Sequence, residues 1–344
     1  MDSTQILDAL VTTEIIFTAA SLLISVYIVF KFRHITTLHG NFRLVLSYAL
    51  VGGNVFNISH LYLYPRVIEF YKLNEFGSYD TTLDIRFAAI CYWTGAVIAL
   101  TKFLLLCLER FLATAYRTDY EHRGTCIGWT MITIHIVISL AIGFTHLSAY
   151  DICVAYTESC DGYCERSCAM SHFFYDGNTL YIAISFLVGL VCWVLGIVEA
   201  IVLFIVNKKL GTQLDTLSLR FQYRENLETL KAMLPGVTIY GIMELICCTA
   251  VVYVMVSMQD LATDDVGKQI LFHITYVAMA SYNLFFSLYN LLGYPPLSVA
   301  FINDLRAIIC MKPLELSAVV APKEVRERVN EKQKYFEYVN RQWK

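Results

Sequence analysis

Residues 179–206 read TLYIAISFLVGLVCWVLGIVEAIVLFIV, and Glu199 is the single charged side chain in this run. A helix that crosses the hydrocarbon core of a membrane needs roughly 20 mostly apolar residues. The run is long enough, and it is closed by the polar sequence Asn207-Lys208-Lys209. It therefore predicts a transmembrane helix, and the rest of the chain can be searched for others.

Six further runs of this kind occur in the chain, which has 344 residues, 57% of them hydrophobic and 16% charged. The seven predicted spans are 15–30, 42–64, 85–108, 126–147, 179–206, 233–258 and 270–292. They are too long and continuous for the alternating strands of a membrane barrel. We predict an all-α membrane protein, with a seven-transmembrane helix bundle over 15–302 and a cytoplasmic tail over 303–344.

Lys and Arg are unequally distributed between the two sets of loops. If the loop after the first span is cytoplasmic, that side carries 20 of them, and the other side carries the remaining five outside the spans. Cytoplasmic loops carry the excess of positive charge in membrane proteins. We therefore predict that the N-terminus, residues 1–14, is extracellular and that the C-terminus is inside. The net charge of −3 also argues against a nucleic-acid partner, which selects for a basic surface.

Four cysteines, Cys153, Cys160, Cys164 and Cys168, fall between the fourth and fifth spans on the predicted outer side. Disulfides form in that compartment, and four cysteines allow three pairings that the sequence does not distinguish. The spacing of four residues from Cys160 to His172 would also suit a zinc site on a helix. We favour the disulfide interpretation because it needs no helix, and we predict neither a metal nor another cofactor.

Three short motifs lie on the predicted cytoplasmic side. The third span ends in Glu109-Arg110-Phe111-Leu112-Ala113-Thr114, and Tyr120-Glu121 follows. The next cytoplasmic loop contains Leu217-Ser218-Leu219-Arg220-Phe221-Gln222 and then Glu225-Asn226, and the tail contains Tyr335-Phe336 and Trp343. The order of the three motifs is more specific than any one of them alone.

Together with seven spans, these motifs resemble the nematode serpentine chemoreceptors, most closely class epsilon (Sre), a family of G-protein-coupled receptors. The resemblance extends over essentially the whole chain. It implies a chemosensory receptor in the plasma membrane of sensory cells, which binds an external small molecule and activates a heterotrimeric G protein. It implies a coupling role for Glu109, Arg110, Ala113, Thr114, Tyr120, Arg220, Phe221 and Asn226.

Other functions were weighed against this one. A seven-span membrane transporter or ligand-gated channel remains an alternative, although the chain lacks the paired, interrupted spans of many transporters. We predict no enzyme, since there is no H-E-x-x-H motif and no midplane pair of Asp residues. Arg110 can pair with Glu109 in a closed receptor and face a G protein in an open one. The alternative is that Arg110 is one more positive-inside residue.

The loop from Asn207 to Ala232 has a helical pattern, because Leu217 and Phe221 are four residues apart and leucines recur beyond them. We expect the fifth and sixth spans to continue into the cytoplasm as helices. The exposed part either binds a partner or is a solvated extension.

Three ionisable residues, Lys102, Glu199 and Glu244, lie inside predicted spans, where charges are costly without partners. Lys102 is about 12 Å from the inner end of its helix, and Glu199 is at a matching depth. We predict that these two pair and lock the resting bundle, with Glu244 as the rival partner. The alternative is that Lys102 extends to the membrane interface.

A ligand pocket is predicted in the outer half of the bundle from Tyr92, Trp93, Ala96, Tyr253 and Tyr276, which lie at comparable depths. Aromatic pockets suit small apolar or weakly polar ligands. With 23 Tyr and 21 Phe in the chain, aromatic packing alone would also place rings there. On the inner side, residues 301–310 can form a short amphipathic helix, and Cys310 is a candidate for palmitoylation.

Overall fold

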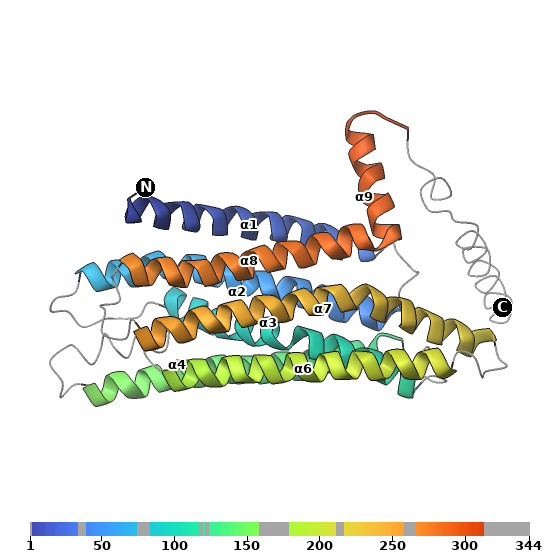
Figure 1. The fold of residues 1–344 in the computed structure, drawn as a ribbon, viewed down its shortest axis with the longest axis horizontal. Helices are drawn as coiled ribbons and strands as arrows, with labels where there is room; N and C mark the ends of the chain where they lie inside the picture. The colour runs from blue at the N-terminus through green and yellow to red at the C-terminus, as the bar shows by residue number, and fades with distance from the viewer. Residues whose placement is uncertain are drawn as a thin grey trace.

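The computed structural model describes residues 2–33, 39–73, 83–116, 120, 124–157, 179–210, 217–257 and 266–312. Within these ranges the chain forms seven long helices and a shorter one (Figure 1). The helices are α1 (Ser3–Phe32), α2 (Gly40–Leu73), α3 (Leu83–Ala115), α4 (Cys126–Thr157), α6 (Thr179–Leu210), α7 (Leu217–Ser257), α8 (Val266–Gly293) and α9 (Pro295–Ile308). No strand occurs in these described ranges.

The long helices form one elongated bundle in which successive helices run in opposite directions (Figure 1). Helix α1 packs against α8 and α2, α2 packs against α3, and α3 packs against both α4 and α6. Helix α6 packs against α7, and α7 packs against α8. This arrangement places α3 inside the bundle, where side chains along its whole length are buried.

The exposed surface of the bundle is apolar. By length and composition, α1, α2, α4, α6, α7 and α8 could each cross a membrane, and large apolar side chains such as Leu23, Val137 and Ile205 are exposed on them. A continuous apolar surface of this kind is stable in lipid and costly in water. Six of the seven long helices thus meet the criterion, and the seventh, α3, is buried among them, which agrees with the predicted all-α membrane bundle.

Helix α1 begins at Ser3, although the first hydrophobic run begins only at residue 15. The Asp2 side chain accepts a hydrogen bond from the Ser3 amide at 2.7 Å, and the Gln5 side chain accepts one from the Asp2 amide at 3.1 Å. Such a capping box starts a helix with polar residues, which a search for apolar runs misses. Helix α2 likewise continues through Pro65, expected at the end of the second span, to Leu73.

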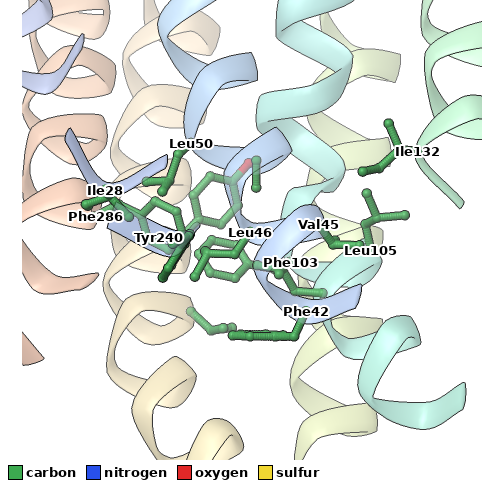
Figure 2. Close-up of a cluster of buried hydrophobic side chains, with 14 of the residues drawn as sticks. Ile28, Phe42, Val45, Leu46, Leu50, Phe103, Leu105, Ile132, Tyr240 and Phe286 are labelled. Atoms are coloured by element: carbon green, nitrogen blue, oxygen red, sulfur yellow. The ribbon is translucent and has the colours of Figure 1, made fainter. Parts of the chain in front are cut away.

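Towards the α9 end of the bundle, a hydrophobic cluster joins seven helices, α1, α2, α3, α4, α7, α8 and α9, and part of it is drawn in Figure 2. Phe103 of α3 packs against Tyr240 of α7 and Phe286 of α8, with ring centroids 5.1 Å and 5.6 Å apart. Nearer the other end, a Cβ atom on Gly95 would lie 2.6 Å from the backbone nitrogen of Phe56. Glycine therefore allows the backbones of α2 and α3 to meet there.

Helix α9 turns away from the bundle axis at the end opposite the N-terminus (Figure 1). Its Asp304 forms an ion pair with Lys31 at 2.7 Å and accepts a hydrogen bond from Tyr27 at 2.7 Å, both on α1. These contacts lower the pKa of Asp304. The helix is longer than the expected segment 301–310, because two prolines at its first turn begin it at Pro295.

Candidate functional site

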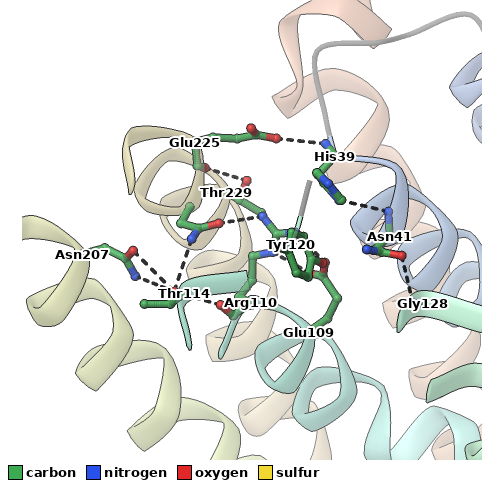
Figure 3. A network of polar contacts seen from close by, with 11 residues as sticks. His39, Asn41, Glu109, Arg110, Thr114, Tyr120, Gly128, Asn207, Glu225 and Thr229 are labelled. Carbon is green, nitrogen blue, oxygen red and sulfur yellow. Dashed lines mark hydrogen bonds and ion pairs between the residues drawn. The ribbon is translucent and has the colours of Figure 1, made fainter. Parts of the chain in front are cut away.

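The polar network at the α9 end of the bundle is centred on Arg110 of α3 (Figure 3). Its Nε and Nη2 donate to the two carboxylate oxygens of the adjacent Glu109, at 2.5 Å and 2.6 Å. Both side chains are almost completely buried, and the guanidinium also lies 4.7 Å from the ring centroid of Phe42 on α2. Burial of this pair is possible because the bidentate geometry neutralises both charges.

Tyr120, which follows α3, lies beside the ion pair (Figure 3). Its hydroxyl donates to Glu109, and its ring lies 4.4 Å from that of His39, which precedes α2. Burial and the negative charge of Glu109 raise the pKa of Tyr120. Burial, with the positive charges of Arg110 and Arg43, lowers the pKa of His39 to about 4. His39 is therefore neutral at physiological pH and adds no positive charge beside Arg110.

Asn226 of α7 links the ion pair to two further helices. Its side-chain oxygen accepts a hydrogen bond from Arg110 Nη1 at 2.9 Å, and its Nδ2 donates to Thr114 of α3 at 3.2 Å. Thr114 also accepts from Asn207 of α6 at 3.2 Å. Glu225, next to Asn226, accepts from the backbone amide of His39 at 2.9 Å. The network therefore holds the ends of α3, α6 and α7 and the loop before α2 together.

A second polar group lies deeper in the bundle, around Lys102 of α3. Its amine donates to Oδ1 of Asn283 on α8 at 3.2 Å. Four aromatic rings also lie within 6 Å of the amine, those of Phe103, Tyr240, Tyr282 and Phe286, with the Tyr282 centroid at 4.3 Å. Such rings stabilise a desolvated cation.

Glu244 of α7 is the carboxylate that interacts electrostatically with Lys102. It is buried, and a Cβ atom on Gly189 of α6 would lie 2.7 Å from its Oε1. Its carboxylate interacts with the hydroxyl of Tyr240, whereas the hydroxyl of Tyr282 has no hydrogen-bond partner among the described residues. Several buried polar atoms thus face one another around one cation.

Towards the N-terminal end of the bundle, aromatic side chains meet between α3 and α8. The hydroxyls of Tyr92 and Tyr276 are 2.7 Å apart. Trp93 stacks on His146 of α4, with ring centroids 3.8 Å apart, and Ala96 is buried. These side chains lie toward the bundle interior, at the end opposite the Arg110 network.

Comparison with protein families identifies the chain. The family model described as serpentine type 7TM GPCR receptor class ab chemoreceptor matches residues 1–344. The chain belongs to this family. It is thus a chemosensory G-protein-coupled receptor, a class of chemoreceptors rather than of enzymes, as the sequence predicts. No curated protein matches the chain.

The family match also corrects one prediction and leaves another without support. The predicted resemblance to serpentine chemoreceptors is confirmed, but the class is ab and class epsilon is not supported. The motifs quoted for class epsilon therefore do not separate it from class ab. The match gives no support to the alternative of a transporter or channel.

Of the predicted coupling residues in the class ab receptor, Glu109, Arg110, Thr114, Tyr120 and Asn226 contact one another directly. Ala113 is buried on the same helix. Arg220 and Phe221 lie in the first turns of α7, but their side chains are outside the described structure. His39, Phe42 and Asn207 also belong to the network but were not predicted from the sequence. The polar residue that closes the apolar run at 207 was the only signal for any of these.

The predicted pair of Lys102 and Glu199 does not form in the receptor. No hydrogen bond or ion pair joins them, and Glu199 is only half-buried on α6. Matching depth was the basis of that prediction, but the rotation of each helix about its axis decides which side chains meet. On α6 the interior positions near Lys102 and Glu244 include Gly189 and Gly196.

Most of the remaining predicted site residues either lie outside the predicted sites or are not described by the structure. Tyr253 is 53% exposed on α7 and does not join Tyr92 and Tyr276. Cys160, Cys164, Cys168 and His172 lie outside the described residues, as does the side chain of Cys153, so neither the disulfide nor the zinc interpretation is addressed. Cys310 follows α9 and is exposed.

Proposed function

We propose that this receptor binds a small external molecule at the Tyr92–Tyr276 end of the bundle and activates a heterotrimeric G protein at the Arg110 end. The observation that supports coupling at that end is the Arg110 network, which ties α3 to α7 through Asn226 at 2.9 Å. Arg110 can act as a switch if its side chain has two arrangements, one paired with Glu109 and one facing the G protein, and ligand binding changes their populations. Separation of α7 from α3 would release Arg110 toward a partner.

The ligand pocket is proposed from Tyr92, Trp93, Ala96 and Tyr276, without Tyr253. Paired hydroxyls and stacked rings offer a few polar groups in an apolar surround, the composition typical of small-molecule sites. We propose Lys102, Asn283 and Glu244 as the charge lock between the two ends, in place of Lys102 and Glu199. It connects α3, α7 and α8, the helices that also contribute to the pocket or the Arg110 network.

A panel of small molecules tested for G-protein activation in cells that express the receptor is the experiment for this function. At least one compound is expected to give a response that is saturable and absent from cells without the receptor. The same compound is expected to give little response with Arg110→Ala. A response of unchanged size in Arg110→Ala receptors at equal surface density would contradict coupling through the Arg110 network.

The receptor is proposed to lie in the plasma membrane of sensory cells, with its N-terminus outside and its tail inside. The excess of Lys and Arg at the Arg110 end supports this orientation. An epitope placed at the N-terminus is expected to bind antibody on intact cells, and one at the C-terminus only after permeabilisation. The reverse pattern would contradict the orientation and the assignment of both sites.

The exposed Cys310 is proposed as a site of palmitoylation. It follows α9, whose contacts with Lys31 and Tyr27 attach it to the inner end of α1, close to the membrane interface in the proposed orientation. Acyl-exchange labelling of the receptor is expected to fall to background in Cys310→Ser. Equal labelling of both proteins would place the acyl group on another cysteine.

A further inference from the structure

Three buried ionisable side chains meet between α1, α2 and α8, at the end of the bundle opposite Arg110. Glu14, His60 and His273 are 0%, 1% and 1% exposed. The Glu14 Oε1 lies 2.7 Å from Nδ1 of His60, and its Oε2 lies 3.2 Å from Nδ1 of His273. Because an ionised carboxylate only accepts, each Nδ1 carries the hydrogen. We call these residues the carboxylate–imidazole cluster.

Aromatic rings enclose the cluster and keep water out. Tyr276 of α8 stacks on His60, with ring centroids 3.3 Å apart, and Tyr64 of α2 meets His273 edge-on at 4.2 Å. Tyr92 of α3 contacts the cluster through the hydroxyl of Tyr276. The cluster therefore adjoins the proposed ligand pocket.

The other charged and titratable groups near this end are held by contacts of their own or lie at the surface. Arg66 of α2 donates to the Tyr62 carbonyl at 2.8 Å and lies on the Tyr62 ring, while Tyr62 donates to Asp84 of α3. Asp8 of α1 is exposed. Among the described residues, His146 of α4 stacks on Trp93, and Cys247 of α7 contacts the Thr275 carbonyl. None of these supplies a second carboxylate to the two imidazoles.

The charge of the cluster depends on how many protons the two imidazoles hold. If one proton is added beyond the hydrogen on each Nδ1, one imidazole becomes an imidazolium that balances the carboxylate. The cluster is then neutral, which is the least costly state in a water-excluded site. A second proton leaves a net positive charge, with two imidazolium rings 5.5 Å apart. It also places hydrogen on both Nε2 atoms, and the buried Nε2 of His273 has no partner among the described residues. The second proton is therefore accommodated only if the helices separate.

We propose that the carboxylate–imidazole cluster is a proton-binding site and that external acid is a second ligand of the receptor. This rests on the proposed orientation, which places the cluster at the outer end, and on the proposed coupling at the inner end. Histidine is the residue type that proteins use most often to respond to acidification, and the cluster contains two of them on one carboxylate. Because each member comes from a different helix, the second proton pushes α1, α2 and α8 apart, and α8 is joined to α3, which carries Arg110, through the hydrogen bond from Lys102 to Asn283. A shift of α8 transmitted through this contact favours the arrangement in which Arg110 is released. Acid therefore increases signalling.

The test compares wild-type receptor with His60→Gln, His273→Gln and the double variant. Glutamine keeps a side-chain amide that can donate to Glu14 but does not take up a proton. Wild-type receptor without added ligand is expected to activate G protein about fivefold more strongly at pH 5.5 than at pH 7.5. The double variant is expected to retain the pH 7.5 level and lose the increase.

His135→Gln is the matched control. His135 is also held between helices, at 2.7 Å from both Tyr48 and Thr101, but its hydrogen bonds are to hydroxyls and not to a carboxylate. Its variant is expected to keep the full response to acid. A response that survives in the double variant, or is lost equally in the control, would overturn the proposal.

A second measurement does not depend on coupling. Purified wild-type receptor is expected to unfold at least about 3 °C lower at pH 5.5 than at pH 7.5, and the double variant is expected to show a smaller difference. Equal differences would overturn the proton site. If the difference in unfolding follows expectation but no stimulus activates G protein, the proposed function fails and the proton site stands. A histidine-dependent response to Zn²⁺ at pH 7.5, without one to acid, would replace the proton by a metal ion.

Discussion

Arg110→Ala is expected to lower ligand-stimulated G-protein activation by at least about tenfold, because the side chain makes charge-assisted contacts worth about 1.5–3 kcal/mol. In the proposed mechanism the Arg110 guanidinium exchanges these contacts for contacts with the G protein. Alanine removes the guanidinium, so neither set of contacts can form. Concentration–response curves at matched surface density give the measurement. Ligand binding, which occurs at the other end of the bundle, is expected to persist.

Arg110→Ala leaves Glu109 buried without its cation, which can lower the amount of folded receptor. The double variant Glu109→Gln/Arg110→Ala removes both charges and serves as the folding control. It is expected to reach the cell surface in near-normal amounts and to remain silent. Recovery of signalling in the double variant would show that the single variant failed through misfolding, and coupling through Arg110 would be refuted.

Glu109→Gln alone is expected to act in the opposite direction. It replaces the carboxylate that holds Arg110 at 2.5 Å and 2.6 Å, and it frees the guanidinium to adopt its second arrangement. Basal activation is expected to rise about threefold to tenfold. Tyr120→Phe removes only the hydroxyl that donates to Glu109 and is expected to give a smaller rise in the same direction.

Lys102→Met is expected to reduce the free energy of unfolding by about 1–3 kcal/mol, because it removes the buried amine that donates to Asn283 and interacts electrostatically with Glu244. The double variant Lys102→Met/Glu244→Gln removes both charges and is expected to recover most of this loss. Because it also removes the link between α3 and α7, its basal signalling is expected to exceed that of wild type. Thermal unfolding of purified receptors and basal G-protein activation supply the two readouts.

Glu199→Gln is the control for the charge lock, since Glu199 is also a glutamate on a membrane-spanning helix but is only half-buried and makes no ion pair with Lys102. It is expected to change the free energy of unfolding by no more than about 0.5 kcal/mol. If Glu199→Gln restored the stability of Lys102→Met and Glu244→Gln did not, the partner of Lys102 would be Glu199, as the sequence predicts. If Lys102→Met left both stability and basal signalling unchanged, no lock would exist.

The hydrophobic runs predict the seven long helices because the bilayer imposes a length that local sequence reveals. Their ends are less predictable, since the capping box at Asp2 and Gln5 is polar and Pro65 does not end α2. Helical spacing of Leu217 and Phe221 correctly predicts that α7 extends beyond its hydrophobic run. Such features depend on neighbours along the chain, which a sequence displays directly.

Contacts between helices are harder to predict from the sequence than the helices themselves. The Arg110 network was partly predictable because Glu109 and Arg110 are adjacent and the motif supplied Asn226. Lys102 and Glu199 share a depth but face different neighbours, and rotation about a helix axis is poorly defined where every face is apolar. Glu14, His60 and His273 belong to no motif and come from three distant helices, so only the fold brings them together.

Helix α7 has 41 residues, from Leu217 to Ser257, and at about 1.5 Å per residue it is about 60 Å long. That is about twice the thickness of the hydrocarbon core. Glu244 lies about 40 Å from the Leu217 end, so a tilt of about 10° around Glu244 would displace that end by about 7 Å. The part of α7 beyond Glu244, up to Ser257, is only about 20 Å long, so the same tilt would move that end about half as far. In the proposed mechanism, a small rearrangement at the charge lock would thus become a larger movement of the end of α7 that carries Asn226.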